Sequence, residues 1–541
     1  MNRPQEQAQA ALPIPTSSAW APLRHREFLA LWTASFAALI GSWMSDSSAA
    51  WLMTTLATSP LQVALVQAAM LLPVVLLGLP AGALADLVDR RMLLIVTQFW
   101  VGCVALVLFA VTLLGRLTPE LLLLLTFGNG IGMAMRMPAL SAMIPDLIPR
   151  PELGRALALN SVAMNGSRIV GPIVAGVLFA WWGGEWVFLV YGVMSVLVAL
   201  RFMRWKRSKR ASSLPSERFV GAMRLGVQFA MQTPLMVAVI LRSSVFSFFG
   251  MAILALLPLV ARVRLEGNAN TYTMLLAAVG AGAIMAVALL PYLRRRLSRD
   301  RLVAAGTVLQ AFATIALAEA TSGWTAALAA LLSGAAWMAV MNALAVAAQI
   351  SLPDWVRARG LAVYQVCGMA FAILGSVVWG LVAAIASIEI SLMAAGVGAL
   401  IALALAGHKR VGGMRELDLT PVRVLPEFVT SLPIDNDQGP VLVGVEYRID
   451  PLRAEAFIEL MAESRRWRLR MGAVHWGLLH DIANPGRFVE QYVMESWVDR
   501  LRQIERLTAE DIALRDRKNE FHLGPKEPEA EHFLLESTRK N

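Results

Sequence analysis

Twelve long apolar runs constrain this chain more than any other feature of its sequence. A helix needs about 20 mainly apolar residues to cross the hydrocarbon core of a bilayer. Only 16% of the 541 residues are charged, against about 25% in a soluble globular protein. The runs predict an all-α membrane protein with helices near residues 28–57, 61–84, 92–114, 119–146, 155–180, 186–203, 235–260, 270–292, 302–320, 324–350, 360–385 and 389–406.

The basic residues between the runs predict the orientation of the chain. Clusters of Arg and Lys follow every second run, whereas the opposite loops hold little beyond Arg116, Arg262 and Arg264. Because Lys and Arg are retained on the cytoplasmic side of a membrane, we expect both termini in the cytoplasm and a multi-pass protein of the bacterial inner membrane. The same clusters explain the net charge of +10, so we expect a lipid bilayer and no nucleic acid as partner.

Shifts in composition divide the chain into six segments. Residues 1–24 are polar and Pro-rich, residues 204–234 are basic, and the charged fraction rises after residue 406. The predicted segments are a cytoplasmic N-terminal tail (1–24), a first six-helix half (25–203), a cytoplasmic basic linker (204–234), a second six-helix half (235–406), a linker (407–438) and a cytoplasmic α+β domain (439–541).

The two predicted halves repeat each other. RALALNSVAMNGSRIVGPIVAG spans residues 155–176, and RGLAVYQVCGMAFAILGSVVWG spans residues 359–380 with the same spacing from Arg to the last two Gly. Both segments start at the same predicted side of the membrane, so the repeat is parallel. Two parallel six-helix repeats with a substrate path between them are the architecture of major facilitator transporters.

The loop GALADLVDRR at residues 82–91 resembles the major facilitator signature, which reads roughly G-x-L-A-D-R-x-G-R-R. Leu87 replaces the usual Arg, and Asp89 replaces the usual Gly. The resemblance implies a charge network that latches the two halves in the outward-facing state. Its predicted members are Gly82, Asp86, Arg90, Arg91 and Asp146. The alternative is a turn whose charges only set the topology.

A second motif lies in the fifth apolar run. The segment NGSRIVGPIVAG resembles the Gly-Pro motif of major facilitator exporters, which here consists of Gly171, Pro172 and Gly176. Small residues and a Pro that removes a backbone hydrogen bond favour close packing against a neighbouring helix. Ordinary packing by small residues is the alternative. The resemblance implies export rather than import.

Nearly the whole chain resembles one branch of this superfamily, the enterobactin-exporter-like transporters, also called transmembrane secretion effectors. The matching stretches include AWLMTTLATSPLQVALV (50–66), MPALSAMIPDLIPR (137–150) and LRSSVFSFFGMAILALLPLVAR (241–262). The resemblance implies efflux of small organic molecules, drug-like or siderophore-like. The chain has no G-x-x-x-x-G-K-[ST] sequence for ATP, so we expect transport driven by an ion gradient. A membrane sensor or assembly factor on the same scaffold is the alternative.

Charged residues inside the predicted spans are candidates for the transport site, because a charge at the bilayer centre costs about 2.5–3.5 kcal/mol. Asp46, Arg136, Arg168 and Arg242 occupy such positions. In this fold the helices carrying Asp46, Arg136 and Arg242 line the cavity. Our hypothesis is that Asp46 carries a coupling proton and that Arg136 or Arg242 binds an anionic substrate group or compensates Asp46. A structural Asp–Arg pair is the alternative.

The segment after residue 438 has a predicted βαββα order, which a last strand near 532–536 would close, and this order predicts a ferredoxin-like domain. It resembles the dimeric domains related to antibiotic-biosynthesis monooxygenases. His475 and His480 lie five residues apart on a predicted strand, which places them on opposite faces and disfavours a metal site. We expect no enzyme activity, cofactor or metal, and favour a regulatory domain or a homodimer through this domain over a cofactor-free oxygenase.

Overall fold

The computed structural model describes residues 20–149, 152–204, 219–406, 434–435 and 437–535. Twelve helices among these residues are long and apolar enough to cross a membrane, which confirms the predicted fold class. A short 3-10 helix, η1 (Ala21–Arg24), precedes them. The first half consists of α1 (Arg26–Leu56), α2 (Pro60–Leu87), α3 (Arg90–Leu113), α4 (Pro119–Leu147), α5 (Leu153–Trp182) and α6 (Gly184–Met203).

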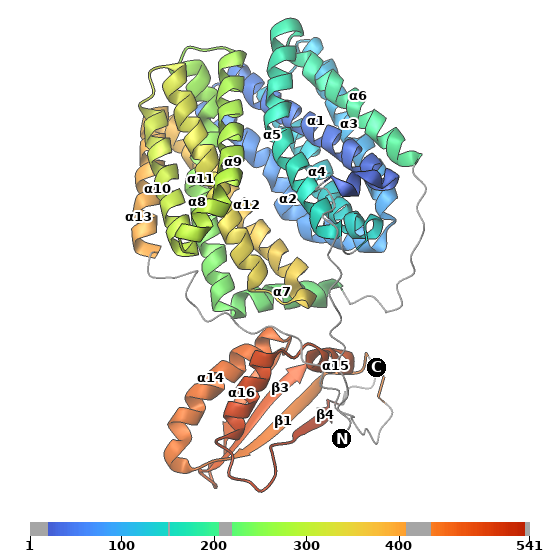
Figure 1. The fold of residues 1–541 in the computed structure, drawn as a ribbon, viewed down its shortest axis with the longest axis vertical. Helices are drawn as coiled ribbons and strands as arrows, with labels where there is room; N and C mark the ends of the chain where they lie inside the picture. Colours follow the sequence, from blue (N-terminus) through green and yellow to red (C-terminus); the bar gives the residue numbers. More distant parts are fainter. Residues whose placement is uncertain (1–19, 150–151, 205–218, 407–433, 436, 536–541) are drawn as a thin grey trace, which may run out of the picture.

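The second half lies beside the first (Figure 1). It consists of α8 (Pro234–Leu259), which continues as a short π-helix, η3 (Val260–Arg264), and of α9 (Ala269–Arg296), α10 (Arg299–Ala318), α11 (Gly323–Ile350), α12 (Asp354–Ile385) and α13 (Ile388–Ala406). We call the end of the bundle next to the C-terminal domain the tail side, and the opposite end the far side.

Local sequence signals determine where many spans begin. Three of them, α2, α4 and α8, start with a Pro, whose fixed φ suits the first helical position. The hydroxyl of Ser298 accepts a hydrogen bond from the backbone N–H of Arg301 at the start of α10. Asn268 and Ser322 form capping boxes at α9 and α11. The polar caps therefore satisfy the backbone groups at the wet ends of apolar helices.

The segment between the halves contains an unpredicted helix, α7 (Phe219–Gln232), within the range 204–234 that the sequence analysis assigned to a basic linker. This helix lies at the tail side, between the spans and the C-terminal domain (Figure 1). Its 14 residues are too few to cross a bilayer, so a search for long apolar runs does not detect it.

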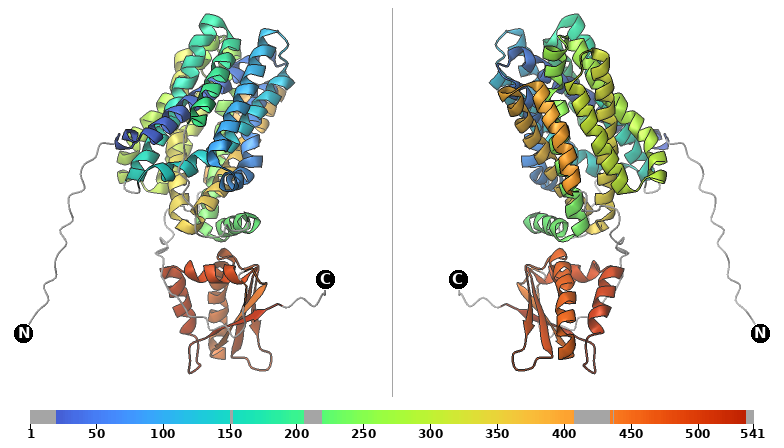
Figure 2. Two further views of the ribbon diagram at one scale, coloured as in Figure 1. Left: turned by 90° about the vertical axis from the view of Figure 1, so that its right-hand side faces the viewer. Right: turned by 90° about the vertical axis from the view of Figure 1, so that its left-hand side faces the viewer.

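The C-terminal domain, which we call the tail domain, folds as an α+β unit with the predicted ferredoxin-like order (Figure 2). Its sheet has the strand order β2-β3-β1-β4 with antiparallel neighbours throughout. The predicted final helix is two helices, because Thr508 starts a new capping box with Asp511. The elements are β1 (Val441–Arg448), η4 (Pro451–Arg453), α14 (Ala454–Arg470), β2 (His475–His480), β3 (Arg487–Met494), α15 (Trp497–Glu505), α16 (Ala509–Asn519) and β4 (Ala530–Leu534).

The tail domain docks on α7 and on the tail-side end of α12. Gln228 of α7 donates from Nε2 to the backbone carbonyl of Ala473 at 2.8 Å. Trp355 of α12 packs against an apolar cluster of the tail domain that contains Trp467, Met471 and Leu514. The guanidinium of Arg506 lies 4.4 Å from the ring centroid of Trp355. The tail domain is therefore attached to the second half through polar and apolar contacts.

Candidate transport site

The two halves meet at the far side of the bundle. One apolar cluster there combines residues of α1 and α2 with residues of α8, α9 and α12. Trp51 of α1 stacks on Tyr272 of α9 with ring centroids 5.8 Å apart, and Arg262 donates from Nη1 to Thr54 Oγ1 at 3.2 Å. The tail-side apolar clusters among the described residues each belong to one half, counting α7 with the second. The far side is therefore the closed end of the interface.

The Gly-Pro motif of α5 makes two close contacts. A Cβ at Gly171 would lie 2.5 Å from Trp43 Cβ of α1, and a Cβ at Gly176 would lie 2.5 Å from Thr273 Oγ1 of α9. Real Cβ atoms do not approach other atoms so closely, so both positions require glycine at this helix spacing. Pro172 lies buried between them. Gly171 thus packs α5 within its own half, and Gly176 packs it against the other half.

The repeat in the sequence is also a repeat of contacts. In the second half, a Cβ at Gly375 of α12 would lie 2.2 Å from the carbonyl oxygen of Phe248 in α8. A Cβ at Gly380 would lie 2.4 Å from Ala64 Cβ of α2. Each half therefore uses the first glycine against its own first span and the second glycine against the second span of the other half.

The interface between the halves opens towards the tail side. Positions 161, 165 and 172 of α5 share one helix face, because 3.6 residues make one turn. Along this face Ser161 is exposed, Asn165 is half-buried and Pro172 is buried. The equivalent positions of α12 show the same gradient, since Gln365 is exposed and Ser376 is fully buried. Polar residues that are exposed on spanning helices fit a water-filled opening better than lipid.

A buried polar cluster lies inside the first half and contains Asp46. This residue of α1 is 8% exposed and accepts hydrogen bonds from Asn129 Nδ2 of α4 at 3.3 Å and from Ser42 Oγ at 3.5 Å. Asn129 in turn accepts a hydrogen bond from the Tyr191 hydroxyl of α6 at 3.0 Å. Three neutral side chains from three helices, Ser42, Asn129 and Tyr191, thus surround the buried carboxylate of Asp46. We call these residues, together with Arg136 and Gln98, the first-half polar cluster.

Arg136 completes this cluster without a direct ion pair to Asp46. Its Nη1 donates to Gln98 Oε1 of α3 at 3.3 Å, and it lies close enough to Asp46 for the two charges to interact. Arg136 Nε and Gln98 Nε2 are buried and have no hydrogen-bond partner among the described residues. Buried donors are normally satisfied. The cluster therefore has spare hydrogen-bonding capacity for a water molecule or a ligand.

The second half has a smaller, uncharged polar contact in its interior. Gln310 Oε1 of α10 accepts a hydrogen bond from Ser333 Oγ of α11 at 3.1 Å. Arg242 of α8 lies in this half, and its Nη1 is 3.1 Å from Asp300 Oδ1 at the start of α10. Arg242 also lines a cavity of about 40 Å³ between α8, α10 and α13. The structure therefore brings Asp46 and Arg136 together but places Arg242 apart, beside its own acid.

The predicted gating loop is described only in part. Asp89 caps α3, because its side chain accepts a hydrogen bond from the backbone N–H of Arg91 at 2.9 Å. Arg91 donates from Nε to the carbonyl of Phe202 at 2.9 Å and also contacts the carbonyl of Met203. It therefore ties α3 to the end of α6, where the helix dipole favours a cation. The surroundings of Gly82 and the side chains of Asp86 and Asp146 lie outside the described part of the chain, and Arg90 has an interaction partner.

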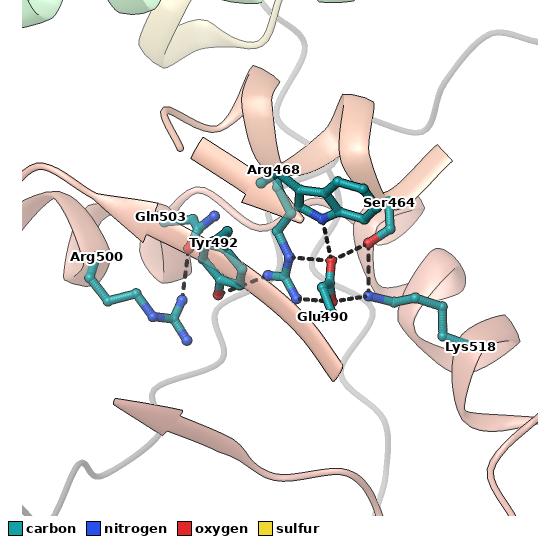
Figure 3. Close-up of polar contacts among 8 residues, drawn as sticks. Ser464, Arg468, Glu490, Tyr492, Arg500, Gln503 and Lys518 are labelled. Atoms are coloured by element: carbon teal, nitrogen blue, oxygen red, sulfur yellow. Dashed lines mark hydrogen bonds and ion pairs between the residues drawn. The ribbon is translucent and has the colours of Figure 1, made fainter. Parts of the chain in front are cut away.

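The tail domain contains a second charged cluster, shown in Figure 3. Glu490 of β3 is fully buried and accepts hydrogen bonds from Ser464, Arg468 and Lys518 at 2.7 to 3.3 Å and from Trp476 at 3.0 Å. Burial alone would raise the pKa of Glu490, but the charges of Arg468 and Lys518 hold it below its usual range. Burial lowers the pKa of Lys518 to about 8. These contacts join α14 and α16 to the sheet.

A model of the transmembrane secretion effector family matches residues 17–540. The chain belongs to this family. Solved structures of transporters share its fold. A bacterial homologue of the human lysosomal transporter Spinster has a TM-score of 0.58 at 18% identity, over 72% of this chain and 98% of the homologue. A nucleoside transporter has a TM-score of 0.60 at 12% identity, over 71% of this chain and 99% of its own.

Curated relatives of this secretion effector include efflux proteins. Macrolide efflux protein A of Streptococcus pyogenes is 25% identical over 45% of this chain and 60% of its own length. The staphyloferrin A transporter of Staphylococcus aureus is 27% identical over 31% of this chain and 43% of its own length. The matches therefore span 60% or less of the length of these two relatives. With the twelve candidate spans, the family match shows a multi-pass membrane protein whose curated relatives include efflux proteins.

Proposed function

We propose that this secretion effector exports small organic molecules in exchange for protons, and that Asp46 carries the coupled proton. The observation that supports this most strongly is the first-half polar cluster. It holds a carboxylate inside a spanning bundle, away from any direct ion pair among the described residues and next to donors without partners. A carboxylate in such surroundings can exist in charged and neutral forms. The interior polar contact between Gln310 and Ser333 in the second half is, by comparison, uncharged.

The direction of transport depends on which side of the membrane the tail domain occupies. The tail-side ends of the spans carry basic clusters such as Arg294, Arg295 and Arg296 at the end of α9. The far side carries few, among them Arg262 and Arg264. By the positive-inside rule, the tail side faces the cytoplasm of a bacterial inner membrane. The state described here, closed at the far side, is then the one that receives cargo from the cytoplasm.

The class of cargo is proposed from the relatives and the family. Their names assign them to macrolides and to staphyloferrin A, which are both small organic molecules. The predicted latch formed by Asp86, Arg90, Arg91 and Asp146 belongs to the same proposal. It would hold the tail side closed after the halves have rocked to the outward-facing state.

The test is efflux of a panel of dyes, antibiotics and siderophores from cells with and without the protein. Asp46→Asn keeps the shape of the side chain but cannot lose a proton. Glu120→Gln is the matched control, because Glu120 is an exposed acid at the far-side end of α4. We expect a protonophore and Asp46→Asn each to abolish efflux, and Glu120→Gln to leave it unchanged. Efflux that survives Asp46→Asn would contradict the coupling assignment. Absence of any movement across the panel would favour the sensor or assembly role.

We further propose that the tail domain joins two copies of the chain. Its helices cover one face of the sheet, and the other face carries apolar side chains. Leu479 and Phe533 on that face are each 49% exposed. An uncovered apolar sheet face of this kind is typical of a protein interface. Leu479→Asp and Phe533→Asp should convert a dimer in light scattering to a monomer, and an unchanged mass would contradict the proposal.

A further inference from the structure

Arg168 is a charged residue in the middle of α5. It belongs neither to the helix-packing contacts described above nor to the first-half polar cluster. Its side chain is half-buried, and its guanidinium carbon lies 5.1 Å from the ring centroid of Trp43 in α1. Among the residues that the structure describes, Arg168 makes no hydrogen bond and has no carboxylate within 4.0 Å. A charge at this depth normally pairs with another group or faces water.

Other arginines of the spanning bundle differ from Arg168 in this respect. Arg136 donates to Gln98, and Arg242 pairs with Asp300. Arg168 is thus a cation held by an aromatic face while its hydrogen-bond donors remain available. A guanidinium has five N–H donors in a fixed fork, which fits a carboxylate with two parallel bonds.

Arg168 lies at the inner end of the opening between the two halves. It lies on the face of α5 that carries exposed Ser161 and half-buried Asn165 towards the tail side and buried Pro172 towards the far side. The next residue, Ile169, contacts α9 of the other half, because a Cβ at Gly280 would lie 2.3 Å from Ile169 Cγ1. The polar face therefore leads from the tail side to Arg168 and ends where the two halves close.

The internal repeat shows that packing does not require a cation at this position. The 22-residue repeats that begin at Arg155 and Arg359 place Ala372 opposite Arg168. Ala372 is 6% exposed in α12, and the glycine contacts that follow it are the same as in α5. The same helix packing thus forms in α12 with the methyl group of Ala372 and in α5 with Arg168. The arginine must serve a purpose other than packing.

We propose that Arg168 and Trp43 form the recognition end of the cargo site and that this site takes an organic anion. A carboxylate of the cargo binds the guanidinium fork of Arg168, and a flat or apolar part of the cargo lies against the indole of Trp43. The proposal rests on the proposed export function and adds the chemical class of its cargo. Asp46 lies in a separate cluster, so cargo binding and proton binding use different side chains.

The experiment uses the full chain in lipid nanodiscs and three probes that share a naphthyl group and differ in charge. The probes are 2-naphthoate, 2-naphthylmethanol and 2-naphthylmethylammonium, measured by isothermal titration calorimetry. We expect the wild-type protein to bind the carboxylate about tenfold more tightly than the alcohol, the ratio of one charge-assisted hydrogen-bond pair, and the ammonium least tightly. Equal affinities for the three probes, or no binding of the carboxylate, would overturn the proposal.

Three variants separate recognition from folding. Arg168→Gln should remove the preference for the carboxylate, and Arg168→Lys should retain part of it. Trp43→Leu should weaken all three probes but keep their order. Arg116→Gln is the control, because Arg116 is an exposed arginine in a far-side loop. A preference for the carboxylate that persists in Arg168→Gln would refute the assignment.

This result is independent of the export assay. Binding in nanodiscs needs no gradient, and efflux from cells needs no knowledge of where the cargo binds. Efflux without a charge preference in binding would leave the proposed function standing and remove the anion site. A charge preference without efflux would leave the anion site standing and remove the proposed function.

Discussion

Replacing Glu490 by Gln should remove a large part of the free energy of unfolding of the tail domain. Glu490 is 0% exposed and accepts five hydrogen bonds. A Gln side chain has the same shape but no charge, and its amide N–H groups would point at donors. Arg468 and Lys518 would remain buried without a counter-charge. Removal of one partner of a buried ion pair costs about 3–5 kcal/mol, a large share of the roughly 5–15 kcal/mol that stabilises a domain.

The measurement is thermal and urea unfolding of residues 434–541, which contain their own sheet and apolar clusters. For a domain of this size 1 kcal/mol corresponds to about 4–8 °C, so we expect the Tm to fall by on the order of 20 °C. The matched control is Glu463→Gln, because the pair of Glu463 with Arg517 is exposed and should contribute less than about 1 kcal/mol. A loss below about 1 kcal/mol for Glu490→Gln would refute the reasoning.

The same residue predicts a dependence of stability on pH. The pKa of Glu490 is lower in the folded state than its usual value of 4.5. Its stabilising contribution is therefore complete above about pH 4.5 and is lost as the pH falls towards the folded-state pKa. Wild type and Glu490→Gln should become more alike in stability as the solution is acidified. A constant difference between them from pH 7 to pH 3 would contradict this.

Three further changes test the packing of the bundle and the docking of the tail domain. A Cβ at Gly334 would lie 1.9 Å from the carbonyl oxygen of Val279, so Gly334→Ala should separate α11 from α9 and lower the yield of folded protein in size-exclusion chromatography. Gly176→Val should collide with Thr273, loosen the far side and increase labelling of a cysteine introduced there by Thr54→Cys, whereas unchanged labelling would contradict the closed interface. Trp355→Ala should remove an aromatic contact that anchors the tail domain and should therefore speed hydrogen exchange in α14. Exchange in α14 at the wild-type rate would contradict this docking contact.

The sequence predicted the spans, the repeat and the strand order well, because each rests on a pattern within one segment. Twelve spans follow from runs of about 20 apolar residues. The cluster around Asp46 was not predictable in this way beyond Ser42, which lies four residues away on the same helix. Asn129, which donates to Asp46, and Tyr191, which donates to Asn129, lie on other helices at 83 and 145 residues from Asp46, where no local pattern marks them. The partner of Arg242 was missed because Asp300 lies in a basic stretch that indicates topology.

The attachment of the tail domain has a mechanical consequence. The halves are sealed at the far side in the state described here, and in the proposed cycle this seal opens as the halves rock about the site between them. Displacements therefore grow with distance from the middle of the bundle. The tail domain lies beyond the end opposite the seal and is anchored to α12 through Trp355 and to α7 through Gln228. The tail domain therefore moves with the second half. Closing the tail side must displace the tail domain or break its contacts with α7 and α12, and two copies joined through their tail domains would have to change state together.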